Sequence, residues 1–293
     1  MNRIEKQAGY FESFDGHPIY YESRGKGETI VFVYGIACLM NHWHFQIDYF
    51  SKNFRTIILD FRGHHKTKTP KDKATLSIES LAKDLKILLK SLKISQAHFI
   101  AHSFGAQVVL KLYDQDPKLF KSLAFINGFA RNPIKEMFGL GLVEKLYHFI
   151  KISYGENPAL WKTLWKLSVE SPFAVPFTSL AGGFNLKLTN LKDIQVYAKG
   201  VANMDLNVFL IFFEELMNYD GTSVLNKIKC PTLIISGEND RVTPLKFQKE
   251  MSRRISESQL LIVPYGSHCT QLDFPDYINL RIEKFLAEVL NKA

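Results

Sequence analysis

Short apolar runs alternate with longer amphipathic stretches along most of the chain, and this pattern predicts strands alternating with helices. Unbroken apolar runs suit the buried strands of a parallel sheet. An unbroken β-branched and aromatic run covers 29–33, and shorter or mixed apolar runs cover 55–59, 97–101, 119–126, 231–236 and 259–263. Two further β-rich runs, 10–14 and 18–22, are joined by Asp15-Gly16, which predicts a hairpin. Together the runs predict an α/β fold with a mostly parallel, eight-stranded sheet covered by helices.

One long segment interrupts this alternation. Residues 131–222 show no strand signal and contain helical runs at 136–152, 159–169, 191–201 and 206–218. We therefore expect a core made of 1–130 and 223–293, with 131–222 inserted after the sixth strand as a helical cap. Its aromatic side chains have two interpretations, the lining of an acyl pocket or the packed interior of the cap itself. They include Tyr147, Phe149, Trp161, Trp165, Phe173 and Phe177.

The clearest chemical signal lies between the run at 97–101 and a predicted helix over 107–113. The connecting residues read Ala101-His102-Ser103-Phe104-Gly105. In such a tight strand-to-helix turn the serine hydroxyl is held above the sheet edge, and the small neighbours avoid collisions with adjacent elements. The N–H of Phe104, at the start of the helix, faces any negative oxygen that forms beside Ser103. An ordinary strand-to-helix turn is the alternative reading of this pentapeptide.

A serine hydroxyl needs a base to become a nucleophile, and the base needs an acid to fix its tautomer. Asp240 follows the run at 231–236 by four residues, and His268 follows the run at 259–263 by five. Parallel strands end at one edge of the sheet, so both loops are expected to open beside Ser103. The alternatives are a turn or helix-capping role for Asp240 and a structural loop position for His268.

These motifs resemble those of the α/β-hydrolase superfamily, and the resemblance covers nearly the whole chain. The turn at 101–105 resembles its nucleophile elbow, with Ala101 at the position of the first glycine. Residues 230–244 resemble its acid segment, and 265–268 resemble its histidine segment. The resemblance implies a capped serine esterase or lipase-like enzyme in which Ser103, Asp240 and His268 are catalytic and no cofactor is needed.

The resemblance also implies an oxyanion hole made by the backbone N–H groups of Ile36 and Phe104. The His-Gly pair that precedes the first donor in the family is Tyr34-Gly35 here. This replacement keeps the backbone donor, changes what braces the loop, and puts a phenol where it can shape the pocket floor.

A second loop, 60–67, resembles the family's Asp-x-Arg-Gly-x-Gly-x-Ser, with His65 at a glycine position. We interpret Asp60 and Arg62 as braces of this loop. His102 is expected to be structural, with its side chain pointing away from the reacting face.

Fold and triad do not fix the substrate. An apolar cap with nine acidic and nine basic residues favours an uncharged, moderately lipophilic ester. Thioesterase, lactonase, carbon–carbon hydrolase, acyltransferase and cofactor-free haloperoxidase chemistries remain open, as does a ligand receptor with a slow triad. Epoxide hydrolases and haloalkane dehalogenases resemble this chain but use an aspartate at the position of Ser103.

Composition and charge limit the classes of partner that we expect for this chain. The formal net charge of +8 comes from lysines spread along the chain rather than a basic stripe, so no nucleic-acid partner is expected. No apolar run approaches the roughly 20 residues that cross a bilayer, and no secretory signal is evident. Three cysteines without paired spacing favour reduced thiols and a cytoplasmic location. No metal site is expected, because no carboxylate or cysteine completes the histidines at 42, 44, 64 and 65.

Overall fold

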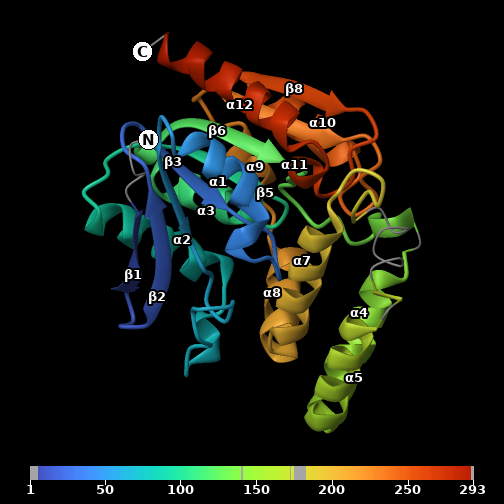
Figure 1. Cartoon of the computed structure of the whole chain (residues 1–293). Helices are drawn as coiled ribbons and strands as arrows, with labels where there is room; N and C mark the ends of the chain where they lie inside the picture. The colour runs from blue at the N-terminus through green and yellow to red at the C-terminus, as the bar shows by residue number, and fades with distance from the viewer. Residues whose placement is uncertain (1–5, 140, 172, 175–182, 292–293) are drawn as a thin grey trace.

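A computed structural model describes residues 6–139, 141–171, 173–174 and 183–291. Eight strands form one sheet in the order β1-β2-β4-β3-β5-β6-β7-β8 (Figure 1). They are β1 (Lys6–Glu12), β2 (Pro18–Arg24), β3 (Thr29–Val33), β4 (Arg55–Leu59), β5 (Ala97–His102), β6 (Phe120–Ile126), β7 (Thr232–Gly237) and β8 (Ser258–Val263). β2 pairs antiparallel with β1 and β4, and all other pairs are parallel. The predicted mostly parallel sheet is confirmed.

Helices follow the parallel strands. They are α1 (His44–Phe50), α2 (Ile78–Ser91), α3 (Gly105–Gln115), α10 (Lys246–Arg254), α11 (Thr270–Asp273) and α12 (Pro275–Leu290), with short 3₁₀ turns η1 (Met40–Trp43), η2 (Lys73–Thr75) and η3 (Pro117–Leu119). In the sheet, β4 lies on one side of β3 and β5 lies on the other. The connection from β3 to β4 therefore crosses the sheet in the opposite direction to the connection from β4 to β5. Crossovers between parallel strands are almost always right-handed, and this rule puts α1 and α2 on opposite faces of the sheet. Consistent with this, α2 packs on α3 while α1 packs on α12.

This reversal places the carboxyl ends of β3 and β5 side by side. Both strands are buried along their whole length, as their mostly apolar sequences predict. In open α/β sheets, the crevice at such a reversal is where ligands bind. The turns that follow β3 and β5 are therefore the expected position of a functional site.

The long connection from β6 to β7 carries the remaining helices. They are η4 (Met137–Gly139), α4 (Val143–Glu156), α5 (Pro158–Glu170), α7 (Leu191–Asn203), α8 (Leu206–Asn218) and α9 (Thr222–Leu225). In Figure 1 this connection lies at one end of the sheet, and the α4–α5 hairpin stands furthest from it. α8 contacts α2 of the core, and α9 packs against α3 and α10.

One predicted cap helix is wrong at its start. The sequence predicted a continuous helix over 136–152, whereas the structure has η4 followed by α4, which begins at Val143. Phe138 and Gly141 take left-handed backbone angles, with φ of 57° and 60°, and these break the helix. Within the described residues, no single helix is long and apolar enough to cross a membrane. One pair, α7 and α8, reaches the length, with a bend of 101° between its members.

Candidate active site

The turn after β5 has the geometry of a strained elbow. Ser103 has a φ of 53°, a left-handed conformation that is uncommon for a residue with a side chain. Its N–H donates to the carbonyl of Ile126 on β6, which ties the turn to the sheet. Gly105 is required two residues later, because a Cβ there would lie 2.6 Å from the carbonyl oxygens of both Val33 and Tyr34. The elbow and the turn after β3 are therefore in direct backbone contact.

Three side chains predicted from separate loops meet at this edge. The Oγ of Ser103 lies 2.9 Å from Nε2 of His268, and Nδ1 of the same ring lies 2.9 Å from Oδ2 of Asp240. The loops after β5, β7 and β8 supply the three residues. The arrangement can carry a proton from the hydroxyl to the imidazole while the carboxylate stabilises the resulting cation.

Asp240 is held in place by its own loop. Its Oδ1 accepts hydrogen bonds from the N–H groups of Val242 and Thr243, at 2.8 and 2.9 Å. Its Oδ2 accepts from the Thr243 hydroxyl at 2.7 Å and faces the His268 ring. The turn considered as an alternative is thus present together with the imidazole contact, whereas the helix-capping role is not, because α10 begins at Lys246 with Leu245 at its N-cap. One oxygen mainly fixes the loop, and the other orients the base.

The backbone of His268 is braced by two residues. Its carbonyl oxygen accepts from Asn127 Nδ2 at 2.6 Å and from His102 Nε2 at 2.9 Å. The prediction that His102 points away from the reacting face was wrong, since its ring centroid lies 4.8 Å from that of His268. Asn127 was not predicted. The sequence feature that could have pointed to Asn127 is its place at the end of a predicted strand. In the structure its φ is 48°, a conformation that asparagine tolerates well.

The two predicted oxyanion donors lie on the two turns that touch. Ile36 follows β3, and Phe104 follows the nucleophile at the start of α3. A Cβ on Gly35 would lie 3.1 Å from the Ser103 Cβ, so glycine permits this close approach. In the described part of the chain, the N–H groups of Ile36 and Phe104 have no protein acceptor. Both are therefore free to donate to an oxygen of a bound molecule.

The Tyr34 side chain links the turn after β3 to the loop after β4. Its hydroxyl accepts from the Phe61 N–H at 2.7 Å and donates to Asp60 at 3.2 Å, and it is fully buried. Burial raises the pKa of Asp60 to about 6. The phenol does not form part of the pocket floor, because it turns away from the cavity toward the 60–61 loop. Of the two expectations for Tyr34, the structure supports the bracing of a loop and not the shaping of the pocket floor.

The 60–67 loop is held as predicted. The fully buried guanidinium of Arg62 forms ion pairs with Asp84 at 2.7 Å and with Asp15 at 2.5 Å. His65, at a glycine position of the family motif, has a φ of 44°, which explains why glycine suits that position. His64 accepts from the Ala37 N–H at 3.3 Å, and burial lowers its pKa to about 4, so it remains a neutral acceptor.

A cavity of about 650 Å³ opens above Ser103. Its walls are largely apolar and come from both the core and the inserted helices, including Trp165, Phe209 and Phe213. The remaining predicted aromatics separate into two groups. Tyr147 and Trp161 pack within the inserted helices, whereas Phe149 and Phe173 are 62% and 77% exposed. Phe177 lies outside the described residues.

The four histidines that cluster in the sequence, at 42, 44, 64 and 65, have different neighbours in the structure. His44 lies 3.5 Å from Asp193, and His65 lies 3.5 Å from Asp60. His42 instead lies beside Cys38 and His102, a grouping that the sequence did not predict. The three cysteines are free, and two of them, Cys38 and Cys269, are buried beside the candidate site.

Comparison with known proteins identifies the family of the chain. A model of the alpha/beta hydrolase fold matches residues 28–275. "Putative carbamate hydrolase RutD" of Stutzerimonas stutzeri is 26% identical, covering 92% of this chain and 97% of its own length. Human "Epoxide hydrolase 4" is 24% identical, covering 94% and 76%. The solved structure of a thermophilic esterase from Thermogutta terrifontis has a TM-score of 0.75 at 20% identity, covering 97% of this chain and 99% of its own. The chain belongs to the α/β-hydrolase family, and its relatives are hydrolases of several kinds.

Proposed function

We propose that the protein is a serine hydrolase that cleaves carboxylic esters of uncharged, moderately lipophilic acids. The observation that carries the proposal is the hydrogen-bonded line from Ser103 through His268 to Asp240 at the mouth of a largely apolar cavity. In this mechanism Ser103 attacks the acyl carbonyl as His268 takes its proton, and Asp240 orients the imidazole and offsets its charge.

The next steps use the same groups. The N–H groups of Ile36 and Phe104 stabilise the tetrahedral oxyanion. His268 returns the proton to the departing alcohol, which leaves an acyl group on Ser103. Water activated by His268 then attacks the acyl-enzyme and releases the acid. The sequence of steps requires no further group, so the proposal includes no cofactor.

The nucleophile also bears on the other chemistries among the relatives. A hydroxyl that opened an epoxide would form an ether on Ser103, which water does not readily cleave, whereas a carboxylate nucleophile forms a hydrolysable ester. This argument disfavours epoxide hydrolysis. A carbamate, lactone or thioester offers the same attackable carbonyl, so these substrates are the alternatives. Nucleic acid is not among the proposed partners, and the cytoplasmic location stays a prediction.

Turnover of a p-nitrophenyl ester series of increasing acyl length tests the proposal, with a matched thioester and carbamate beside it. We expect multiple turnovers with an optimum at intermediate length, and loss of that turnover in Ser103→Ala. Ser91→Ala, at the distant end of α2, is the matched control and should behave as the wild type. Binding of the esters without turnover would support the receptor alternative instead. Unchanged turnover in Ser103→Ala would overturn the assignment.

A further inference from the structure

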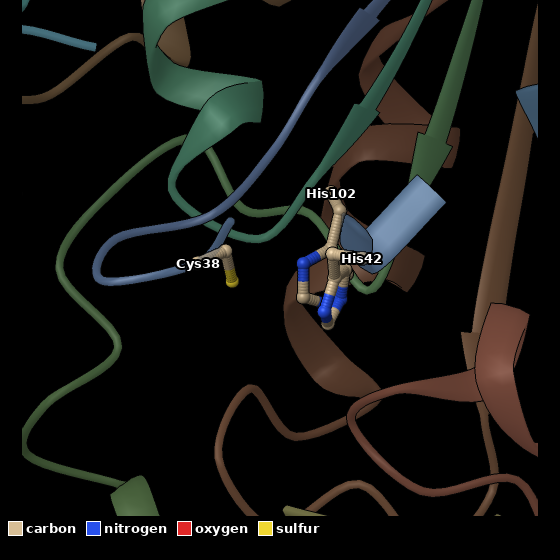
Figure 2. A group of neighbouring side chains, drawn as sticks. All are labelled: Cys38, His42 and His102. Atoms are coloured by element: carbon tan, nitrogen blue, oxygen red, sulfur yellow. The ribbon is translucent and has the colours of Figure 1, made fainter. Parts of the chain in front are cut away.

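A group of three potential metal ligands lies beside the candidate triad. Cys38 comes from the turn after β3, His42 from η1, and His102 from the last residue of β5. One ligand atom from each lies within 4.8 Å of the others, and all three residues are buried. Figure 2 shows the Cys38 side chain opposite the two imidazoles, which lie together. Residues far apart in the sequence thus present one sulfur and two imidazoles to a shared space.

Both imidazoles have an unpaired nitrogen in this cluster. His102 Nε2 faces the carbonyl oxygen of His268, which can only accept, so Nε2 carries the hydrogen and Nδ1 keeps a lone pair. That Nδ1 is buried and, in the part of the chain that the structure describes, has no hydrogen-bond partner; His42 Nε2 is in the same situation. Each unpaired buried group costs about 1–3 kcal/mol. Two of them side by side suggest a ligand that uses both.

The sulfur faces the same space as these nitrogens. The point where a Cβ of Gly35 would stand is 3.2 Å from His102 Nδ1 and 3.5 Å from Cys38 Sγ. The two ligand atoms therefore look onto the same side-chain-free stretch of backbone. Both Cys38 and His102 also border the cavity above Ser103, so an ion held here would keep a position open toward it.

We propose that Cys38, His42 and His102 bind a Zn²⁺ ion and that occupation of this site inhibits the hydrolase. Sulfur and imidazole ligands select zinc over magnesium or calcium. Three protein ligands plus one open position is a common zinc geometry. On binding, the Cys38 thiol releases its proton to solvent, a Zn–S bond forms, and water leaves the ion to make room for the two nitrogens.

The geometry also gives a reason for inhibition. Zn–S and Zn–N bonds of about 2.3 and 2.0 Å put tetrahedral ligand atoms roughly 3.5 Å apart, so ligand atoms up to 4.8 Å apart must draw together. His102 precedes Ser103 and donates to the His268 carbonyl, so its movement displaces both. The positive ion near the His268 ring also opposes formation of the imidazolium that the mechanism requires.

The binding part of the proposal is tested on the full chain with Zn²⁺ and with Co²⁺, without any substrate. We expect one equivalent of Zn²⁺ to bind, and Co²⁺ to give a thiolate charge-transfer absorption in wild type and in Ser103→Ala alike. Cys38→Ser and His42→Asn should each weaken Zn²⁺ binding by about a hundredfold or more, and Cys38→Ser should abolish the absorption. Cys230→Ser and His44→Asn are the matched controls and should bind as the wild type does.

The inhibition part rests on the proposed function. Added Zn²⁺ should lower ester turnover at least tenfold in wild type and both controls, with recovery on chelation, and should have much less effect in Cys38→Ser and His42→Asn. Each variant is compared with its own zinc-free rate. Equal inhibition in Cys38→Ser would place the ion on His268 itself and overturn the proposal. Weak binding without the thiolate absorption would overturn it too. If no ester is turned over, the proposed function fails, and the Co²⁺ absorption still decides the site.

Discussion

The sheet edge and the α4–α5 hairpin differ in how firmly their residues are fixed. All five residues of β3 and all six of β5 are buried, and the elbow between β5 and α3 is in backbone contact with the turn after β3. In contrast, α4 buries only Tyr147, and α5 buries no residue. The difference indicates a division of work. Backbone packing fixes the turns at the sheet edge, whereas the hairpin contributes side chains such as Trp165 to the wall of the cavity.

The first prediction concerns the fixed region. Asp240→Asn should lower ester turnover about ten-thousand-fold, because the amide no longer holds His268 in the tautomer that accepts the serine proton. Steady-state kinetics with a p-nitrophenyl ester measure the loss. Asp276→Asn, in the first turn of α12, is the control and should keep full activity. A loss below tenfold in Asp240→Asn would show that the carboxylate does not orient the base.

The same substitution in the two regions should have opposite effects. Gly105→Ala should destabilise the protein by about 1–3 kcal/mol, because the new Cβ would lie 2.6 Å from the carbonyl oxygens of Val33 and Tyr34. Gly155→Ala, within α4, meets nothing within 4 Å and should stabilise by about 0.5–1 kcal/mol through helix propensity. Urea unfolding measures both. Equal changes in the unfolding free energy of the two variants would contradict the difference in packing between the sheet edge and the α4–α5 hairpin.

A buried histidine of β5 should give the core a distinct pH dependence. Burial lowers the pKa of His98 to about 4, so the folded protein keeps it neutral while the unfolded chain binds a proton below about pH 6.5. Stability is therefore lost as the pH falls from about 6.5 toward 4, by up to about 1.4 kcal/mol per pH unit for this group.

His98→Asn should remove that contribution, so the unfolding free energy of the variant should fall less steeply than that of the wild type over this range. Urea titrations at several pH values measure the two slopes. Ser122→Ala is the control, since it removes the hydroxyl 2.8 Å from His98 Nδ1 but leaves the imidazole. Parallel curves for wild type and His98→Asn would contradict the expected proton linkage.

The smallest effect is expected in the α4–α5 hairpin. Trp165→Ala enlarges the cavity and should shift the preferred acyl chain toward longer esters, with less than about a tenfold change for the acetate. Phe149→Ala is the matched control because Phe149 is mostly exposed. The ratio of kcat/KM for long and short esters measures the shift. An equal shift in both variants would show that Trp165 in the cavity wall does not select the chain length of the ester.

The difference between the buried sheet and the inserted helices also explains which elements the sequence could predict. The predicted bounds of β3 and β4 are those observed, because each run is rich in β-branched and apolar residues and has a charged residue at one border, Glu28 before β3 and Asp60 after β4. The break before α4 was missed, since helical spacing continues through residues whose backbone angles end the helix.

For the candidate site, loops that follow parallel strands could be placed from strand order alone, and Ser103, Asp240 and His268 do meet. The Asn127 brace and the Cys38–His42–His102 group could not be placed in this way. They depend on how side chains turn once separate elements have packed, which neither periodicity nor loop order specifies.

The most direct test of the account is to find which residue a fluorophosphonate probe modifies, by peptide mass analysis after stoichiometric reaction. The account predicts one phosphonyl group per chain, carried by Ser103, together with complete loss of ester turnover in the labelled protein. A modification at any other residue, or a fully labelled protein that still hydrolyses the ester, would contradict it.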